Sequence, residues 1–268
     1  MIAYFRSIKI ERSKIMDSET GKINSIKNTA RIVGVLYIIG TVAGILSVVI
    51  TGPILNTPDY LAKIPANESQ VIMGALFILI MGLALAMVPV LMYPVLKKFN
   101  ETLALGYVVF RGGLETFTYF AVVISILLLL PLGRAFIQAG APDQSDFQAM
   151  GTLLQGAKAI SANLTEIVFP LGALMFYYVL YRSRLIPRWI SGWGLIAVAL
   201  FIAEALLNLF GVITPDSIIQ TLLVLPMAVQ EMVMAIWLIV KGFDPSAIAS
   251  ISAGADHDKV AMAVNLAK

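Results

Sequence analysis

Six long runs of apolar residues, separated by shorter polar stretches, dominate the sequence. A helix needs about 20 consecutive apolar residues to cross the hydrocarbon core of a bilayer, and each run comes close to or exceeds that length. The pattern therefore predicts an all-α integral membrane bundle of six transmembrane helices. The predicted spans are residues 32–51, 71–93, 103–130, 162–181, 189–210 and 217–240.

The polar stretches divide the chain further. Residues 1–30 read as a polar, basic cytoplasmic tail with Met1 or Met16 as its start, residues 31–243 as the six-helix domain, and residues 244–268 as a flexible cytoplasmic tail. Residues 52–70 contain three prolines and are expected to form an irregular loop.

The connection between the third and fourth helices carries an apolar stripe at helical spacing. This stripe predicts that helix four begins early, with an amphipathic turn or two at the outer interface. Its members are Phe147, Met150, Leu153, Leu154, Ala157 and Ile160.

Basic residues are distributed unequally between the two sides of the predicted bundle. With Arg111 set aside, fifteen Lys and Arg lie on the side of the two termini and three on the other side. Cytoplasmic loops carry the excess of Lys and Arg in membrane proteins. Both termini are therefore predicted to be cytoplasmic.

Composition removes several classes of function. The 268 residues are 59% hydrophobic and 13% charged, with no cysteine and one histidine, His257, in the polar tail. Thiolate chemistry, histidine-bound haem and serine–histidine hydrolysis all lack their side chains within the bundle. We expect no cofactor, no metal site and no nucleic-acid partner; the lipid bilayer is the expected partner, and oligomerisation is left open.

Arg111 and Glu115 place two opposite charges near the middle of the third apolar run. Charges at the centre of a membrane helix are costly and face the bundle interior or an aqueous cavity. The two residues are four apart and can pair along one helix face. Since Arg before Glu is the less favourable order in a helix, each is expected to reach another helix as well, either as a clamp between helices or as part of a binding site.

Further polar residues lie within the predicted spans. If all the intramembrane glutamates were ionised, Arg111 would leave the interior at a net charge of −3. A low-dielectric interior does not tolerate that imbalance without a proton, a cation or water. The remaining candidate site residues are Glu204, Glu231, Glu166, Gln230, Asn208 and Asn163.

Proline in a membrane helix frees a backbone carbonyl and bends the helix. Kinks are expected at Pro89, Pro170 and Pro226, in the second, fourth and sixth helices. Glu166 precedes Pro170 by four residues and Glu231 follows Pro226 by five, so freed carbonyls and carboxylates could converge.

Three segments resemble one family of multi-pass membrane proteins. They are ARIVGVLYIIGTVAG in helix one, FPLGALMFYYVLYRSRLIPRW at 169–189 and EMVMAIWLIVKGF at 231–243, together with Arg111 and Glu115. Over about residues 29–243 the chain resembles the domain of unknown function 4386 family. The resemblance implies a six- or seven-helix protein in the plasma membrane of a bacterium or archaeon, and it implies no activity.

Three functional hypotheses follow. The favoured one is a protein that binds or moves a small solute, a proton or a cation through a glutamate-rich polar core. The alternative is a structural or regulatory membrane subunit in which the buried polar residues only fix helix packing. A carboxylate-based intramembrane enzyme ranks third, because the bundle lacks histidine and cysteine, and no catalytic residues are assigned.

Overall fold

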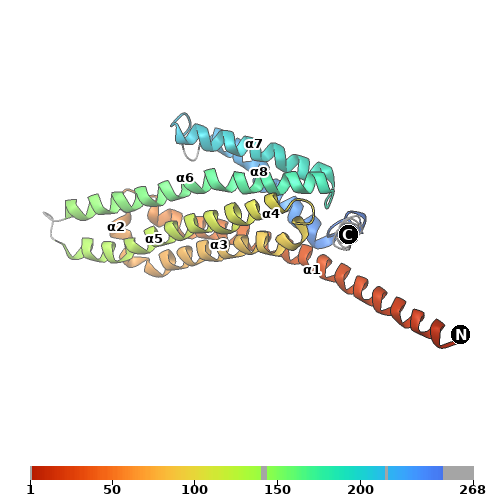
Figure 1. Ribbon diagram of the computed structural model, residues 1–268. Helices are drawn as coiled ribbons and strands as arrows, with labels where there is room; N and C mark the ends of the chain where they lie inside the picture. Colours follow the sequence, from red (N-terminus) through yellow and green to blue (C-terminus); the bar gives the residue numbers. More distant parts are fainter. Residues whose placement is uncertain (1, 140–143, 215–216, 250–268) are drawn as a thin grey trace, which may run out of the picture.

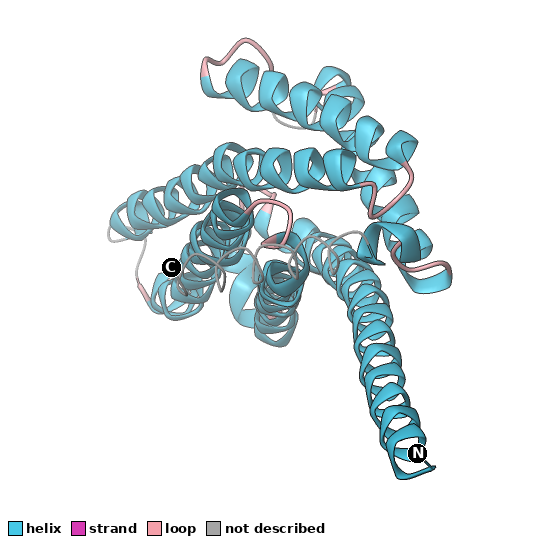
Figure 2. Ribbon diagram, turned by 45° about the vertical axis from the view of Figure 1, so that its right-hand side comes forward, coloured by secondary structure: helices cyan, strands magenta, loops and turns pink. Residues whose placement is uncertain are grey.

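The computed structural model describes residues 2–139, 144–214 and 217–249, with the backbone alone at 2–20 and 22–24. All of its regular elements in this part of the chain are helical (Figures 1 and 2). In chain order they are α1 (Ile2–Leu55), α2 (Tyr60–Lys63), η1 (Ile64–Ala66), α3 (Glu68–Leu96), α4 (Glu101–Tyr107), η2 (Val108–Leu114), α5 (Glu115–Gln138), α6 (Gln144–Ser183), α7 (Arg188–Leu209) and α8 (Ile218–Val240).

Six helices within the described residues are long and apolar enough to cross a membrane, as the sequence predicts. The third span is made of α4, η2 and α5 in one continuous rod, from Glu101 to Gln138. Large apolar side chains such as Val48, Ile124 and Ile196 stay exposed on the outside of the bundle. An exposed apolar surface of this extent fits lipid rather than water as the surrounding solvent.

The six spans form a closed ring. Packing contacts run from α1 to α3, then to α5, α6, α7 and α8, and from α8 back to α1. Figure 1 shows α7 and α8 lying along one side of α6 and separating from it toward the end that carries the α5–α6 connection. Residues from every span therefore face one common interior.

Local sequence signals explain where several helices begin and end. The side chain of Asn100 accepts a hydrogen bond from the backbone N–H of Leu103 at 2.9 Å and caps α4. Ser217 caps α8 in the same way, accepting from the N–H of Gln220 at 3.2 Å. Gly242 follows α8 with φ 72°, a left-handed conformation that glycine adopts without strain.

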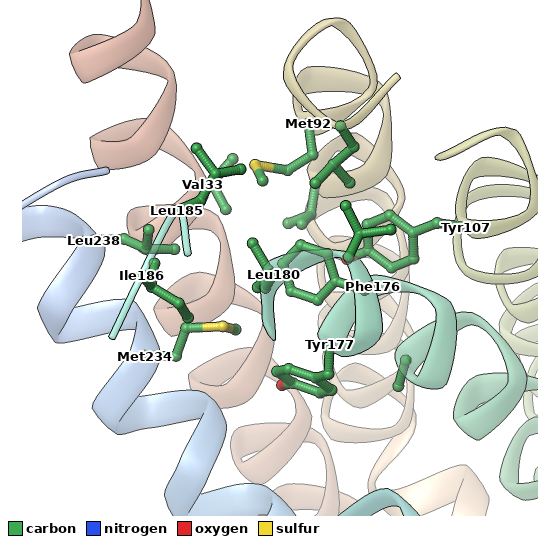
Figure 3. Close-up of a cluster of buried hydrophobic side chains, with 14 of the residues drawn as sticks. Val33, Met92, Tyr107, Phe176, Tyr177, Leu180, Leu185, Ile186, Met234 and Leu238 are labelled. Atoms are coloured by element: carbon green, nitrogen blue, oxygen red, sulfur yellow. The ribbon is translucent and has the colours of Figure 1, made fainter. Parts of the chain in front are cut away.

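Two hydrophobic clusters hold the bundle, one toward each end. The larger lies where α6 meets α7 and includes Tyr107, Phe176 and Leu180 (Figure 3). The smaller joins α1, α3 and α5 to the segment between α1 and α3, through Leu61, Ile64 and their neighbours. We call the first end, with the α3–α4 and α6–α7 turns, the basic end, because Lys97, Lys98, Arg182, Arg184, Arg188 and Lys241 lie there.

The segment between α1 and α3 corrects the predicted loop at 52–70. α1 continues through Pro53 to Leu55, and α2 and η1 then pack against α5. Tyr60, Leu61 and Ile64 are buried there. The prolines of this segment do not prevent short helices from forming, because the apolar residues between the prolines are buried against the bundle.

The long connection predicted at 131–161 is also helical. α5 runs through Pro131 to Gln138, and α6 begins at Gln144, so only residues 139–143 lie between them. Helix four begins early, as predicted, and the residues of the apolar stripe are part of α6 itself. Phe147 and Leu154 pack on the smaller cluster, and the side-chain amide of Gln155 donates to the carbonyl of Leu55 at 3.0 Å. These contacts hold one side of the stripe against the bundle, while Met150, Leu153 and Ile160 remain exposed.

Helical structure extends into both of the predicted tails. Residues 2–30 continue α1 as helix, which projects from the bundle in Figure 1, and Ala30 is already buried in the larger cluster. Residues 245–249 are helical, with Ala247 and Ile248 buried against the bundle, so the flexible tail predicted from 244 does not begin there. The remainder of that predicted tail, 250–268, lies outside the described residues.

Candidate functional site

Arg111 lies in a π-helical turn. η2 (Val108–Leu114) has the sequence VVFRGGL and connects α4 to α5 without a break. Short π-helical segments inside α-helices are frequently found at functional sites. A Cβ atom added at Gly172 of α6 would lie 3.1 Å from the backbone nitrogen of Arg111, so α6 approaches this turn as closely as a glycine allows.

The Arg111 guanidinium joins two carboxylates. Its Nη1 donates to both carboxylate oxygens of Glu115 at 3.2 Å, and its Nη2 donates to Oε1 of Glu231 on α8 at 3.2 Å. Side-chain exposure is 3% for Arg111, 1% for Glu115 and 15% for Glu231, so the bridge is buried but Glu231 remains accessible. The sequence predicts that Arg111 reaches another helix, and the residue that it contacts there is Glu231.

Glu115 does not reach another helix in the same way. Besides the hydrogen bonds from Arg111, Glu115 accepts one from the hydroxyl of Tyr119 at 2.8 Å, and Tyr119 lies one turn further along α5. The guanidinium of Arg111 also lies over the ring of Phe169, 4.4 Å from its centroid, and 5.9 Å from that of Tyr37. Nε of Arg111 is buried and has no hydrogen-bond partner among the described residues. Arg111, Glu115 and Glu231 together are called the charge cluster below. The cluster keeps one unused hydrogen-bond donor, the Nε–H of Arg111.

Glu166 and Glu204 belong to a second polar cluster that joins α6, α7 and α8. The side-chain amide of Asn208 donates to Glu166 at 3.1 Å, and that of Gln220 donates to Glu204 at 3.0 Å. Glu204 is fully buried, and its Oε2 has no partner within the described part of the chain. The glutamates of the predicted polar core thus lie in two groups, and only one contains Arg111.

Two predicted site residues lie outside these interactions. Gln230 is fully buried, accepts from the hydroxyl of Tyr177 at 2.6 Å and donates to the carbonyl of Ile190 at 3.1 Å. It therefore connects α8 to α6 and α7, and it does not line the central pocket described below. Asn163 is half-buried on α6 and is not part of the Glu166–Asn208 pair.

The three prolines lie in helices that line the pocket. A Cβ atom at Gly112 would lie 3.3 Å from Cγ of Pro89, which places this proline of α3 beside the π-helical turn. Pro170 follows directly after Phe169, and Pro226 lies between two residues that line the pocket described next, Val224 and Met227. Pro170 and Pro226 are thus sequence neighbours of pocket-lining residues, and the convergence of freed carbonyls with carboxylates stays a prediction.

A pocket of about 220 Å³ occupies the interior of the ring, and every one of the six spans contributes to its wall. It lies beside the charge cluster and reaches Glu166 of the second cluster. Its polar lining consists of Thr41, Arg111, Glu115, Tyr119, Thr165, Glu166 and Glu231. Its apolar lining consists of Gly40, Met81, Leu85, Phe169, Phe201, Val224, Met227 and Ala228.

Sequence reasoning missed the aromatic and hydroxyl groups of this pocket. The sequence spacing could have predicted two of the tyrosines near Arg111. One helix face carries polar or aromatic residues at intervals of four, namely Tyr107, Arg111, Glu115 and Tyr119. The hydroxyls of Tyr107 and Tyr37 lie 3.2 Å apart next to the arginine. For Phe201 and Thr165 no such signal exists, since they reach the pocket only through the packing of α6 and α7.

Among the described residues, no group of three or more His, Asp or Glu side chains is arranged to hold a metal ion. The polar groups that converge on the pocket are carboxylates, one guanidinium and hydroxyls.

The apolar exterior, the six membrane-length helices and the polar interior define a multi-pass α-helical membrane protein. The chain belongs to the family described as Domain of unknown function (DUF4386), whose sequence profile matches residues 32–242. No curated protein and no solved structure matches the chain.

Proposed function

We propose that this protein binds a small cationic solute within the membrane, in the pocket lined by the six spans. Binding at this depth is the step that a transporter of such a solute requires. The observation that carries the proposal is the pocket itself, because three carboxylates and one guanidinium line a cavity that all six helices build.

The charge of the lining favours a cation over an anion. Glu115, Glu166 and Glu231 face the pocket against Arg111 alone, a formal balance of −2 when all are ionised. Both terminal nitrogens of Arg111 already donate to carboxylates, so the arginine is a charge partner of the glutamates and not a free anion ligand. A bound cation or a proton offsets the surplus negative charge in a low-dielectric site.

The apolar part of the wall favours an organic cation. Phe169 and Phe201 pack edge to face with their centroids 5.0 Å apart, and both line the pocket. Aromatic faces attract organic cations, and the flexible side chains of Met81 and Met227 adapt to ligands of differing shape. Carboxylates and aromatic rings that line one pocket match a small amphipathic amine.

The test compares three ligands of one shape: benzylammonium, benzyl alcohol and benzoate. Each is added to the purified full chain in detergent, and the midpoint of thermal unfolding is measured. We expect benzylammonium to raise the midpoint in a concentration-dependent way and the other two to have little effect. Glu231→Gln and Glu166→Gln should each weaken the response to benzylammonium at least about tenfold, the effect of about 1.4 kcal/mol.

Glu101→Gln is the matched control, because Glu101 is an exposed carboxylate outside the pocket that accepts from the hydroxyl of Tyr93. This variant should respond to benzylammonium like the wild type. A response to benzoate equal to that of benzylammonium would overturn the proposal. So would unchanged responses in both pocket variants.

One observation favours the second candidate, a structural membrane subunit. Arg111 connects η2 and α5 to α8 through Glu115 and Glu231, and a bridge of this kind fixes how helices pack. The triple variant Arg111→Leu, Glu115→Leu, Glu231→Leu should then fold at least as stably as wild type, because apolar replacement of a complete buried ion cluster is often neutral or stabilising. This candidate replaces the first if the triple variant is stable and benzylammonium leaves the wild type unaffected.

A further inference from the structure

A second cavity, a groove of about 620 Å³, lies at the basic end of the bundle, remote from the central pocket. It is formed by the turn that joins α6 to α7 and by the residues at and after the end of α8. Three cationic side chains line it: Arg184, Arg188 and Lys241. Trp237, from the last turns of α8, adds an aromatic wall.

The backbone holds this groove in one shape. Arg184, the residue directly after α6, has φ 57°, a left-handed conformation that residues other than glycine rarely adopt. The next two residues, Leu185 and Ile186, are buried in the larger hydrophobic cluster. The backbone N–H of Asp244 donates to the carbonyl of Leu185 at 2.9 Å and ties the segment after α8 to the turn. The cationic side chains therefore extend from a fixed frame.

The cations of the groove lack acidic partners in the part of the chain that the structure describes. No ion pair involves Arg184, Arg188 or Lys241 there. Arg188 stacks over the ring of Tyr181 at 5.2 Å, which leaves the edges of its guanidinium free to donate. The groove thus presents three cationic side chains that form no ion pair within the described residues.

Asp244, the acidic residue of the lining, is engaged elsewhere. Its carboxylate accepts from the backbone N–H of Ser246 at 2.8 Å and from the hydroxyl of the same residue at 2.7 Å. These hydrogen bonds hold the pKa of Asp244 below its ordinary value. The Asp244 carboxylate thus binds the first residues of the short helix 245–249, and it forms no ion pair with Arg184 or Arg188.

We propose that the groove binds the phosphate headgroup of an anionic phospholipid. Arginine edges and a lysine ammonium are the usual donors to phosphate oxygens. The groove lies where α6, α7 and α8 end, which is the depth of the lipid headgroups for helices that span the bilayer. Trp237 fits the same depth, because tryptophan is enriched at the membrane–water interface.

The experiment measures lipid retention on the full chain by native mass spectrometry, after exchange into detergent with phosphatidylglycerol or phosphatidylcholine. We expect phosphatidylglycerol adducts to persist at concentrations at least about tenfold lower than phosphatidylcholine adducts. Each basic side chain near an anionic headgroup contributes roughly fivefold in affinity. The variant Arg184→Gln, Arg188→Gln, Lys241→Gln should therefore bind phosphatidylglycerol about a hundredfold more weakly.

A matched variant removes the same charge from the same end without touching the groove: Lys27→Gln, Arg31→Gln, Lys97→Gln, all at exposed positions. It should keep the preference for phosphatidylglycerol. Equal losses in the two variants would show attraction to general surface charge and overturn the groove as a site. An absent preference in the wild type would overturn it as well.

The last measurement tests whether soluble phosphate compounds bind the groove in place of a lipid. Glycerol 3-phosphate and inorganic phosphate, added without lipid, should neither raise the thermal midpoint nor displace the phosphatidylglycerol adduct at millimolar concentration. If either compound does so and the groove variant abolishes the effect, the ligand is a soluble phosphate and the lipid assignment is wrong. Circular dichroism of both triple variants checks that the helices are retained.

Discussion

Arg111 is held by charge and by shape together. Its two terminal nitrogens serve different carboxylates on different helices, while its planar face lies over Phe169. A guanidinium suits both demands, because it offers several donors in a plane and stacks on aromatic rings. A lysine ammonium in the same place would carry the charge without the fork or the stacking face.

Two replacements of Arg111 should therefore distinguish the contribution of its charge to stability from the contribution of its planar shape. Arg111→Leu leaves Glu115 and Glu231 buried without a counter-charge, and we expect it to lower the free energy of unfolding by about 3–5 kcal/mol. Arg111→Lys keeps the charge and should lose less, roughly 1–3 kcal/mol. The loss is measured by denaturant unfolding of the purified protein in detergent, with the exposed Lys97→Leu as a control near wild type. Equal stability of Arg111→Leu and wild type would contradict the buried bridge.

At the scale of the elements, the π-helical turn decides where the polar groups point. A π-helical turn depends on what packs against it, and here α6 approaches through Gly172 and α3 through Pro89. The sequence shows two adjacent glycines after Arg111, which are compatible with many conformations. The turn was not predictable for that reason, whereas the pairing of Arg111 with Glu115 was, because it needs only neighbouring turns of one helix.

Gly172→Ala tests the close approach of α6 to the turn. The added Cβ would lie 3.1 Å from the backbone nitrogen of Arg111 and 3.3 Å from two neighbouring Cβ atoms, so the helices must separate. We expect a loss of about 1–3 kcal/mol in the free energy of unfolding and a weaker thermal response to benzylammonium. The measurement is thermal and denaturant unfolding with and without the ligand.

Gly156→Ala is the control on the same helix, because nothing lies within 4 Å of its added Cβ. Alanine has the higher helix propensity, so this variant should match wild type or exceed its stability by up to about 1 kcal/mol. If both variants behave alike, the contact between α6 and the π-helical turn does not determine stability.

At the scale of the molecule, the sequence predicts the spans well and their arrangement poorly. Each span follows from local hydrophobicity, so α3, α7 and α8 agree with their predicted ranges to within a few residues. The ring order, with α8 between α7 and α1, depends on contacts between distant segments. The division of the glutamates into two clusters follows from that order, and no pattern along the chain shows it.

The orientation of the ring can be tested because the chain contains no cysteine. Single cysteines at Asn28 and Ala249 would mark the basic end, and cysteines at Asn56 and Thr214 the opposite end; all four positions are exposed. The excess of Lys and Arg predicts that the basic end faces the cytoplasm. None of the four substitutions removes a charge, so none alters the signal under test.

A membrane-impermeant maleimide applied to intact bacterial cells should label Asn56→Cys and Thr214→Cys. It should label Asn28→Cys and Ala249→Cys only after the cells are lysed. The cysteine-free wild type gives the background, and labelling in lysed cells shows that each site is reactive. The reverse pattern would place the basic groove outside the cell, against a leaflet of different lipid composition, while a mixture would mean that the positive charges do not fix one orientation. The expected pattern instead places the groove at the cytoplasmic leaflet, where the negative surface potential attracts basic segments most strongly.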